Sequence, residues 1–242
     1  MLCVTSHLSE LQIKMDPSIY SNGRYLKSNP GWHVEDSPWK AQQVFRMLGQ
    51  HNIRPRTVAE VGCGAGEILR QLSLSLPSTM FSGFDISIDA IALARTRENE
   101  LVRFYNMDIC DNRDKFDLLL VMDVVEHVED CFGFLRSIRE KAEYKIIHIP
   151  LDMSVSLLVR NRLMDVRRSV GHIHYFSKLT ALALLEDTGY QVLDYFYTPA
   201  YQIAPKDPVH RVMATVRSLA MRVASDITSM MLGGCPLLVL AR

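Results

Sequence analysis

Apolar and polar positions follow two different periods along this chain of 242 residues. Short runs of consecutive apolar residues, such as FDLLLVM at Phe116–Met122, alternate with segments in which apolar residues recur every three to four positions. The runs predict buried strands, and the periodic segments predict helices. Continuous apolar strands are typical of a parallel sheet that is covered on both faces. The pattern therefore predicts an α/β fold with a doubly wound, mostly parallel sheet of seven strands.

The seven apolar runs that we expect to be strands lie at residues 57–61, 80–84, 102–107, 116–122, 144–150, 190–198 and 236–241. Helices are expected before and between these strands, at residues 38–50, 67–75, 88–97, 130–142, 178–188 and 210–231. The first helix has a favourable start, because Ser37 is a good N-cap and Pro38 suits the first turn. Strand and helix thus alternate through the first five strands, as they do in a doubly wound sheet.

The division of the chain follows from where this alternating pattern begins and where it is interrupted. Residues 1–37 carry no clear pattern and are expected to form an N-terminal extension. Residues 38–242 are expected to form one domain. Two helical insertions are predicted within this domain, at about residues 152–170 and 205–232.

Composition narrows the class of protein. The formal net charge is zero, which gives no general attraction to nucleic acid or to an anionic membrane. The five cysteines form no Cys-x-x-Cys pair, which argues against a disulfide framework and a zinc site and fits a reducing cytoplasm. The N-terminus does not resemble a signal peptide, and no apolar stretch reaches the roughly 20 residues that span a bilayer. We therefore expect a cytoplasmic protein with no bound metal and no stable membrane insertion.

Three glycines within five positions follow the first predicted strand and precede a helix. Gly62, Gly64 and Gly66 permit positive φ and let a ligand approach the backbone, although a tight strand-to-helix turn alone would also use them. Glu67 occupies the position where a dinucleotide-binding loop needs a small residue. A carboxylate at this helix start is expected to repel a pyrophosphate, so the loop favours an adenosine cofactor without phosphate.

Two aspartates end the second and third predicted strands, at the edge of the sheet where ligands bind. Asp85 can accept both hydrogens of a ribose diol, and its alternative role is to cap the following helix. Asp108 can accept from an adenine amino group while Ile109 packs on the ring, and the alternative is an ordinary loop aspartate. Because both aspartates lie at the same edge as the glycine loop, we favour the ligand-binding roles.

Four segments in this order, EVGCGAGEILRQL, FSGFDISIDAIALA, NMDICD and FDLLLVMDVVEHVED, resemble class I S-adenosylmethionine-dependent methyltransferases. The resemblance covers about residues 38–198 and is nearest to small bacterial enzymes that act on small molecules. It implies a Rossmann-like fold, S-adenosyl-L-methionine as cofactor and S-adenosyl-L-homocysteine as product. It also implies a set of cofactor contacts: Glu60, Gly62, Cys63, Gly64 and Gly66 at the methionine, Asp85 and Ile86 at the ribose, Asp108 and Ile109 at the adenine, and Met122 and Asp123 beneath the sulfonium.

Methyl transfer to a hydroxyl requires a base, and the segment GHIHYFS offers two histidines. His172 and His174 are two positions apart, so on an extended segment both point the same way, at the rim of the site. We predict that one of them is the base, and the alternative is that a histidine here only caps a loop or a helix start. His127 and Tyr175 are assigned to the acceptor side, although His127 more often stabilises the turn after the fourth strand. His148 is expected inside the sheet as a core residue.

Three further features concern the acceptor and the partners. In the resembling fold an N-terminal segment can cover the open cofactor site, so Trp32 and His33 are assigned to a lid.

Four arginines lie close together in the insertion before the two histidines, and the first, third and fourth share a face if the insertion is helical: Arg160, Arg162, Arg167 and Arg168. They form either a solvated basic face or a site for an anionic acceptor. The periodic stretch at 210–231 is expected to pack or to form an oligomer contact, which leaves a homodimer open.

The sequence therefore predicts an S-adenosylmethionine-dependent methyltransferase that O-methylates a small molecule, such as a sugar, a polysaccharide precursor or a secondary metabolite. N- or C-methylation of a small molecule is the alternative within the same class of enzyme. A non-catalytic protein that only binds S-adenosylmethionine is the alternative outside it. Nucleic acid is not expected as a partner, because the neutral chain has no basic tract with interleaved aromatic residues.

Overall fold

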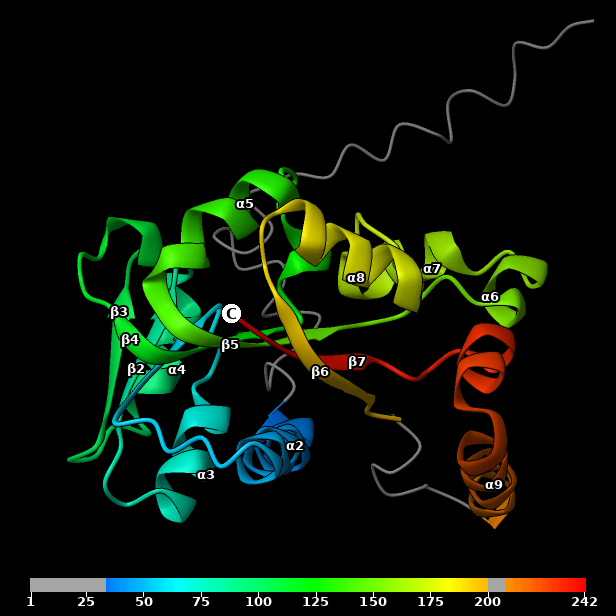
Figure 1. The fold of residues 1–242 in the computed structure, drawn as a ribbon, viewed down its shortest axis with the longest axis horizontal. Coiled ribbons are helices and arrows are strands. Elements are labelled where there is room, and N and C mark those ends of the chain that lie inside the picture. The colour runs from blue at the N-terminus through cyan, green and yellow to red at the C-terminus, as the bar shows by residue number, and fades with distance from the viewer. Residues whose placement is uncertain (1–33, 200–207) are drawn as a thin grey trace, which may run out of the picture.

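The computed structural model describes residues 34–199 and 208–242, and the side chains of 208–213 lie outside this description. A seven-stranded sheet runs through the protein in the order β3-β2-β1-β4-β5-β7-β6 (Figure 1). Strands β1 to β5 pair in parallel, whereas β7 lies antiparallel between β5 and β6. The predicted doubly wound, mostly parallel sheet is thus confirmed. Its strand order reverses between β1 and β4, where ligands bind in open sheets of this kind.

The strands coincide with the predicted apolar runs apart from their ends: β1 Thr57–Val61, β2 Met80–Asp85, β3 Val102–Asn106, β4 Phe116–Met122, β5 Ala142–Ile149, β6 Val192–Tyr197 and β7 Leu237–Ala241. The middle of β4, from Leu118 to Val121, is fully buried because this continuous apolar run faces a layer of helices on each side. Val61 pairs with Val121, so the carboxyl ends of β1 and β4 lie side by side.

Helices cover both faces of the sheet (Figure 1). One layer contains α2 (Ser37–Gln50), α3 (Glu67–Ser75) and α4 (Ile88–Arg95), and the other contains α5 (Cys131–Ile138) and α8 (Lys178–Asp187). Alternate residues of β4 enter the two cores, Leu118 and Leu120 on the α2 side and Leu119 and Val121 on the α5 side. The site-bearing loops are therefore supported by a sheet that is packed on both sides.

Two helices end earlier than their periodicity predicts. α4 stops at Arg95 rather than Arg97, and α5 is followed by a single 3-10 turn at Arg139–Lys141. Ala142, predicted to end this helix, instead begins β5, where it pairs with Phe116 of β4. Pairing with the neighbouring strand decides the state of this residue, and helical periodicity carries no information about it.

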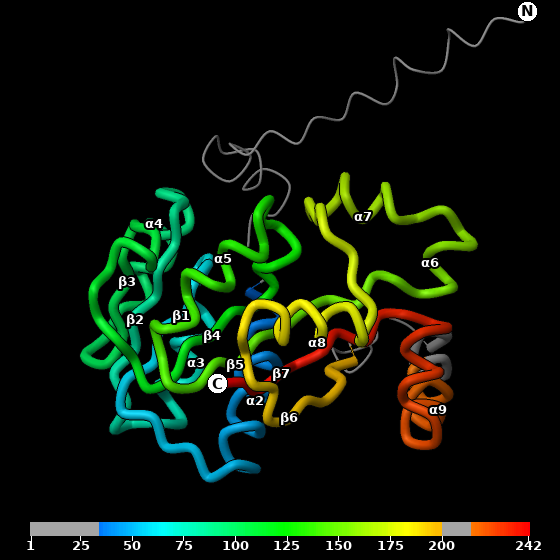
Figure 2. Tube along the Cα trace, turned by 45° about the horizontal axis from the view of Figure 1, so that its top comes forward, coloured from blue at the N-terminus to red at the C-terminus, as the bar shows by residue number. Residues whose placement is uncertain are grey.

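Three helices lie outside the two layers, in the segments predicted as insertions. α6 (Val155–Val159) and α7 (Leu163–Val170) project beyond α8, and α6 contacts α9 (Pro208–Leu232) (Figure 2). Asn161 has a positive φ of 51° between α6 and α7, so the basic insertion is two short helices rather than one. α9 also departs from a single straight helix, because Ala224 leaves the helical region with φ −149° and ψ 68°.

α9 carries exposed apolar side chains at helical spacing, including Val216, Leu219, Val223 and Ile227. In the part of the chain that the structure describes, no helix is both long and apolar enough to cross a membrane. The homodimer that this stretch leaves open stays a prediction.

Candidate active site

The loop between β1 and α3 is bonded to the end of β2. Its three glycines, Gly62, Gly64 and Gly66, have φ values of 66°, 53° and 76°, a region that residues with a Cβ rarely adopt. The Gly64 N–H donates to Oδ2 of Asp85 at 2.9 Å. The loop and the carboxyl end of β2 therefore form one hydrogen-bonded unit.

Two of these glycines are also required by packing. A Cβ at Gly66 would lie 2.3 Å from Cζ of Phe104 in β3, and a Cβ at Gly62 would lie 2.7 Å from Cγ2 of Val124, just after β4. Both distances are far shorter than van der Waals contact. The tight turn by itself is thus a sufficient reason for glycine at these two positions, and the case for a ligand depends on the neighbouring side chains.

Asp85 accepts one backbone hydrogen bond on each carboxylate oxygen, from Gly64 on Oδ2 and from the Ser87 N–H on Oδ1 at 2.8 Å. Ser87, rather than Asp85, caps α4, since the Ser87 hydroxyl accepts from the Ala90 N–H. Burial raises the pKa of Asp85, although the backbone N–H groups oppose this shift. Each oxygen keeps a further lone pair, and two such acceptors are what a ribose diol requires.

The residues expected at the adenine and ribose differ in their exposure. Asp108 caps the short 3-10 helix Ile109–Asp111 (η3), where its carboxylate accepts from the Cys110 N–H at 2.8 Å. Ile109 is 1% exposed and packs in the core, so its side chain offers no surface to an adenine ring, in contrast to the expectation. Ile86, next to Asp85, is 64% exposed and remains accessible to a ligand.

Glu67 does not have the role that its position suggests. Its carboxylate accepts hydrogen bonds from Arg70, from Gln71 and from Arg97, which lies two residues beyond α4, all at 2.7 to 2.9 Å. Burial raises the pKa of Glu67, but these hydrogen bonds outweigh it and lower the pKa to about 2. Two arginines neutralise this carboxylate, so the expected repulsion of a pyrophosphate is wrong as a physical argument.

Glu60 and Met122 lie at the adjacent ends of β1 and β4. Glu60 is buried, and its Oε2 has no hydrogen-bond partner among the described residues. Burial raises the pKa of Glu60 well above its ordinary value. A buried polar atom without a partner is costly, so Oε2 is a site for a donor that a ligand brings. Met122 is buried against the α2-side core and bounds this region with apolar surface.

Asp123 directly follows β4 and is held by side chains from two other elements. Its Oδ2 accepts from Nζ of Lys40 in α2 at 2.6 Å, and its Oδ1 accepts from Nδ1 of His148 in β5 at 2.5 Å. Burial raises the pKa of Asp123, but the charges of His148 and Lys40 outweigh it and hold this pKa well below its ordinary value. Asp123 also has a positive φ of 55°, an uncommon conformation for a residue with a Cβ.

His148 is a buried core residue, as expected, and it also extends the polar contacts of Asp123. Its Nε2 lies 2.8 Å from Oγ1 of Thr198, which donates to the carbonyl of Pro236 at 3.0 Å. Thr198 follows β6 and Pro236 precedes β7. The network therefore joins the end of β4 to the antiparallel half of the sheet.

A second polar group forms around Glu126, in the 3-10 helix Val125–His127 (η4) that follows β4. Glu126 is 0% exposed, and neither of its carboxylate oxygens has a hydrogen-bond partner among the described residues. Burial, reinforced by the charge of Asp123, raises the pKa of Glu126 well above its ordinary value. Oε1 of Glu126 lies 3.9 Å from Nε2 of His127 and 3.8 Å from Nε2 of His172.

Hydrogen bonds orient both of these imidazoles. Nδ1 of His172 donates to Oδ2 of Asp152 at 2.6 Å, and Nδ1 of His127 donates to the carbonyl of Gly171 at 3.2 Å. Burial lowers the pKa of His127 to about 4, and the neighbouring His172 adds to this shift. The fold thus brings His172, predicted as a candidate base, against the segment that follows β4.

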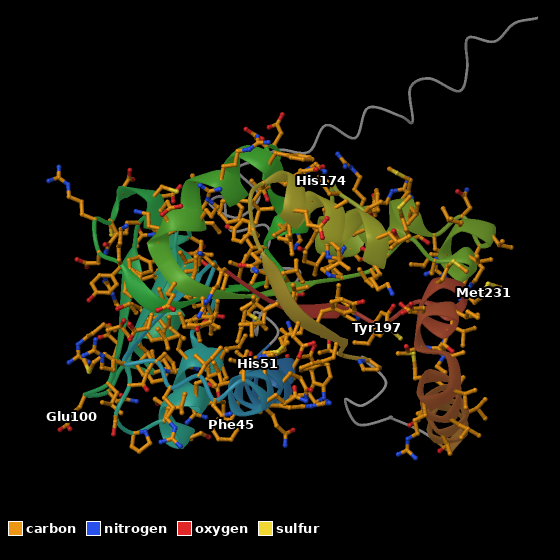
Figure 3. The ribbon with its side chains drawn as sticks, in the orientation of Figure 1. Phe45, His51, Glu100, His174, Tyr197 and Met231 are labelled. Carbon is orange, nitrogen blue, oxygen red and sulfur yellow. The ribbon has the colours of Figure 1, made fainter. Side chains whose placement is uncertain are left out.

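His174 has different surroundings from His172. Its Nε2 donates to the carbonyls of Val128 and Glu129 at 2.9 and 3.2 Å, which is the loop-capping alternative. Figure 3 shows it near α8, on the face of the sheet that α5 and α8 cover. The backbone N–H groups of residues 173 and 174 both donate to the Glu126 carbonyl, so both histidines lie against the segment that follows β4. Their shared direction at the rim of the site stays a prediction.

Tyr175 and the two lid residues are also assigned to the acceptor side. The hydroxyl of Tyr175 donates to the carbonyl of Leu163 at 3.3 Å, at the start of α7. Trp32 and His33, assigned to a lid, lie outside the described residues. Their role stays a prediction.

The four arginines of the insertion do not form one basic face. Arg160 lies beyond α6, whereas Arg167 and Arg168 belong to α7. Arg162 and Arg168 both pair with Asp165, so part of the positive charge is neutralised locally. These pairs favour the solvated-face interpretation, and an anionic acceptor stays a prediction.

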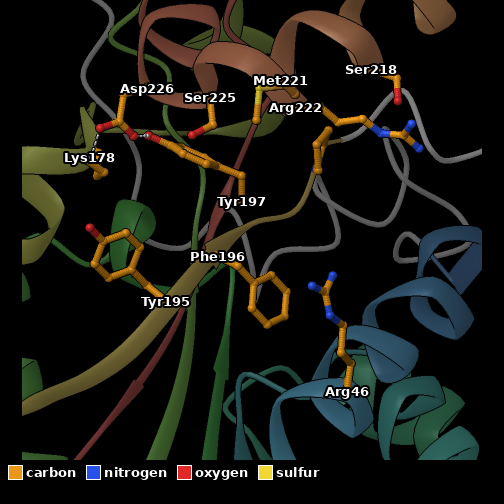
Figure 4. Close-up of a pocket in the computed structure, with 11 residues that line it drawn as sticks. Arg46, Lys178, Tyr195, Phe196, Tyr197, Ser218, Met221, Arg222, Ser225 and Asp226 are labelled. Atoms are coloured by element: carbon orange, nitrogen blue, oxygen red, sulfur yellow. Dashed lines mark hydrogen bonds and ion pairs between the residues drawn. The ribbon is translucent and has the colours of Figure 1, made fainter. Parts of the chain in front are cut away.

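A pocket of about 740 Å³ lies between α2, β6 and α9 (Figure 4). Asp226 of α9 accepts from the hydroxyl of Tyr197 at 2.7 Å and from Nζ of Lys178. The guanidinium of Arg46 lies 4.4 Å from the centre of the Phe196 ring. None of the predicted site residues that the structure describes lines this pocket, so it is separate from the strand-end groups described above.

Three residues of the site escape prediction from the sequence. Lys40 lies on the buried stripe of α2 with Val44 and Met47, and a lysine at such a position is a signal for a buried ion pair. Asp152 lies 20 positions before its partner His172 and carries no local signal. The buried carboxylate of Glu126 is apparent only once the fold surrounds it.

Comparisons with known proteins agree with this arrangement. Residues 33–195, more than half of the 242-residue chain, match a family described as a methyltransferase domain. No curated protein gives a significant match to the sequence.

Three solved methyltransferases, each with bound S-adenosyl-L-homocysteine, share the fold. The N-methyltransferase NodS from Bradyrhizobium japonicum is 17% identical, with 94% of this chain and 98% of that chain covered and a TM-score of 0.60. The plantazolicin methyltransferase BpumL is 15% identical, with 93% and 92% covered and a TM-score of 0.61. The magnesium protoporphyrin IX methyltransferase from Synechocystis is 14% identical, with 84% and 82% covered and a TM-score of 0.59. The chain therefore belongs to the methyltransferase-domain family, and it has the class I methyltransferase fold that the sequence motifs predict.

Proposed function

We propose that this protein transfers the methyl group of S-adenosyl-L-methionine to a hydroxyl group of a small molecule. The observation that carries the proposal is the arrangement of polar residues at the carboxyl edge of the sheet. There the glycine loop bonded to Asp85 lies next to a second group of polar residues, which follows β4 and β5. The first group suits an adenosine cofactor, and the second suits an acceptor that must lose a proton.

The residues at the first group fit the cofactor. Asp85 has a lone pair on each oxygen for the ribose diol, and Ile86 is exposed beside it. Oε2 of Glu60, buried without a partner among the described residues, suits a donor such as the ammonium of the methionine part. When bound, the cofactor supplies a methyl group on a sulfonium, which is activated for in-line displacement. The protein then has to align the acceptor with this methyl group and exclude water.

The second group supports a hydroxyl as the acceptor atom. A hydroxyl must give up its proton as the methyl group arrives, and imidazole is the usual group that assists this step. Nδ1 of His172 is committed to Asp152, so its Nε2, which faces Glu126, carries the lone pair. His174 lacks this arrangement because its Nε2 donates to carbonyls. A neutral amine would need no such group, which is why N-methylation is the second choice.

Calorimetry and product analysis test the proposal. We expect S-adenosyl-L-methionine and S-adenosyl-L-homocysteine to bind at micromolar concentration, and NAD not to bind. Incubation with a panel of sugars, phenols and amines should then yield S-adenosyl-L-homocysteine together with an O-methylated product, identified by mass spectrometry. Binding of NAD alone would exclude the function. Cofactor binding without turnover across the panel would favour a non-catalytic protein.

Substitution of the two histidines tests the assignment of the second group. His172→Gln should lower the turnover number by roughly 10²–10⁴-fold, the usual contribution of a group that assists proton transfer. Cofactor affinity should change little, because His172 does not contact the glycine loop or Asp85. His174→Gln is the matched control and should keep nearly normal turnover, since a glutamine can also donate to the carbonyls of Val128 and Glu129. Equal losses in both variants would contradict the assignment.

A further inference from the structure

Three side chains from two distant segments converge just beyond the carboxyl end of β4. Glu126 and His127 lie in η4, and His172 lies after α7. One carboxylate oxygen and two imidazole nitrogens from these residues all lie within 4.8 Å of one another. The sequence alone predicts no metal site, because its cysteines have no ligand spacing and these three residues are brought together only by the fold.

The carboxylate of Glu126 is the observation that points to a ligand. It is fully buried, and neither oxygen has a hydrogen-bond partner in the part of the chain that the structure describes. An isolated carboxylate is very costly to bury, and buried charges are normally paired with a cation or coordinate a metal. The neighbouring Lys40 cannot fill this role, because its ammonium is bonded to Asp123 at 2.6 Å.

The two imidazoles are oriented as metal ligands usually are. His172 donates its Nδ1 hydrogen to the carboxylate of Asp152, and His127 donates its Nδ1 hydrogen to the carbonyl of Gly171. This is the carboxylate–histidine and carbonyl–histidine support that fixes the tautomer and the ring orientation of a ligating histidine. In both rings the nitrogen nearest to Glu126 is Nε2, and in His172 it is the nitrogen that the bond to Asp152 leaves to bind an ion.

We propose that Glu126, His127 and His172 bind one divalent transition-metal ion of the Zn²⁺ type, with Asp152 as a positioning residue. Two imidazoles and one carboxylate are a ligand set of open zinc sites, whereas Mg²⁺ and Ca²⁺ prefer oxygen ligands. Ligand atoms about 2.1 Å from an ion in tetrahedral geometry lie about 3.4 Å apart. The separations of 3.8 and 3.9 Å from Oε1 therefore need to close by only a few tenths of an ångström.

The place of the site gives the ion a role that rests on the proposed function. η4 begins two residues after Asp123, beside the region expected to lie beneath the sulfonium. Three protein ligands leave a position open, and an acceptor hydroxyl bound there would have its pKa lowered by the ion. The hydroxyl proton passes to solvent, the oxygen lone pair forms the new C–O bond, and the electron pair of the C–S bond goes to sulfur. With the ion bound, His172 acts as a ligand and not as a free base.

Metal titration of the full chain tests the site directly. The protein is treated with a chelator, desalted and titrated with Zn²⁺ by calorimetry and with Co²⁺ by visible absorption, with Mg²⁺ as a comparison. We expect saturation at about one Zn²⁺ or Co²⁺ per chain and much weaker binding of Mg²⁺. Glu126→Gln, of nearly the same shape, should weaken Zn²⁺ binding by more than about 100-fold, and Asp152→Asn should weaken it by about 10–100-fold.

His174→Gln is the matched control, because His174 lies in the same segment but, among the described residues, its imidazole hydrogen-bonds to loop carbonyls and not to a carboxylate. It should bind Zn²⁺ as the unaltered chain does. If Glu126→Gln fails to fold by circular dichroism, His172→Gln takes its place in the comparison. Absence of Zn²⁺ and Co²⁺ binding at micromolar concentration, or binding that Glu126→Gln leaves unchanged, would overturn the proposal.

The same preparations separate this inference from the proposed function. Metal binding is measured without cofactor or acceptor, so it stands even if no methyl transfer is found. Cofactor binding, measured in parallel, should be nearly equal in all four proteins, because none of the changes touches Asp85 or the glycine loop. Methyl transfer that persists in the chelator-treated, metal-free protein would overturn the role of the ion and return His172 to the role of base.

Discussion

The two halves of the carboxyl edge of the sheet hold their carboxylates in different ways. At the ends of β2 and β3, Asp85 and Asp108 accept hydrogen bonds from backbone N–H groups within a few residues or across the adjoining loop. At the ends of β4 and β5, Asp123 and Asp152 are held by the side chains of Lys40, His148 and His172, which come from other elements. Glu126, in this second half, has no hydrogen-bond partner for its carboxylate among the described residues.

In the function that we propose, the first half binds a constant ligand and the second half carries out the chemistry. Backbone N–H groups are placed by the fold alone, so they can present Asp85 in one geometry whatever the surrounding side chains are. Side-chain networks in a buried setting are electrostatically strong, and they shift pKa values where a proton has to move. Substitutions should accordingly affect folding most in the second half and cofactor affinity most in the first.

The largest effect is expected at Asp123. Asp123→Asn removes the charge that neutralises Lys40 and leaves a half-buried ammonium beside His148. This should cost about 3 kcal/mol in the free energy of unfolding, the low end of the range for a broken buried pair. Asparagine tolerates the positive φ at this position, so backbone strain does not explain the loss. Urea denaturation at pH 7 measures the effect.

Lys40→Met is the matched partner change, because it removes the ammonium and keeps the length of the side chain. The double variant should recover part of the stability that Asp123→Asn loses, which a double-mutant cycle quantifies. Additive losses in the cycle would show that the pair contributes no coupling. The second half would then be no more dependent on side-chain networks than the first.

A smaller effect, on affinity rather than folding, is expected at Asp85. Asp85→Ala should weaken binding of S-adenosyl-L-homocysteine by about 1.5–3 kcal/mol, the range for hydrogen bonds to a charged group. Asp117 is a matched control, since it also accepts two backbone hydrogen bonds, from Arg56 and Thr57, but at the opposite edge of the sheet. Asp117→Ala should lower stability and leave calorimetric affinity nearly unchanged. An unchanged dissociation constant in Asp85→Ala would remove Asp85 from the cofactor site.

The contrast between the halves also explains what could be predicted from the sequence. The seven strands, the glycine loop and the strand-end aspartates are local features, because an apolar run and the polar residue that ends it are adjacent in the chain. Topology then places all strand ends at one edge, so Asp85, Asp108 and Asp123 converge without any knowledge of side-chain contacts. The fold and the first half of the site are therefore accessible to sequence reasoning.

The second half depends on contacts between segments that are far apart in the chain. Lys40 meets Asp123 across 83 positions, and Asp152 meets His172 across 20. The side chain of His172 bonds to a carboxylate and that of His174 to backbone carbonyls, and these partners lie 20 and 46 positions away in the chain. Local periodicity carries no information about these contacts, so only the folded structure shows which histidine is paired with a carboxylate.

Glu67 shows the same limit within the first half. Its position at the start of α3 suggests a charge aimed at the ligand, yet its carboxylate contacts side chains one turn further along the same helix. There it bonds to Arg70 and Gln71, and it also accepts from Arg97 in the segment that follows α4. These bonds join α3 to the segment that follows α4, which is a structural role and does not select the cofactor.

The smallest of the three effects is expected from Glu67→Gln, which should lower the free energy of unfolding by about 1–2 kcal/mol at pH 7, because Arg70 is partly exposed and screened. The pKa of Glu67 falls from 4.5 to about 2 on folding, so its contribution is complete above pH 4.5. As the pH falls from 4.5 toward 2, the carboxylate is protonated and the contribution is lost. The gap in stability between the unaltered chain and Glu67→Gln should therefore narrow over this range, as thermal melts can measure. Cofactor affinity should be nearly equal in both proteins. A difference in stability that stays constant down to pH 2 would show that the arginines do not hold this carboxylate.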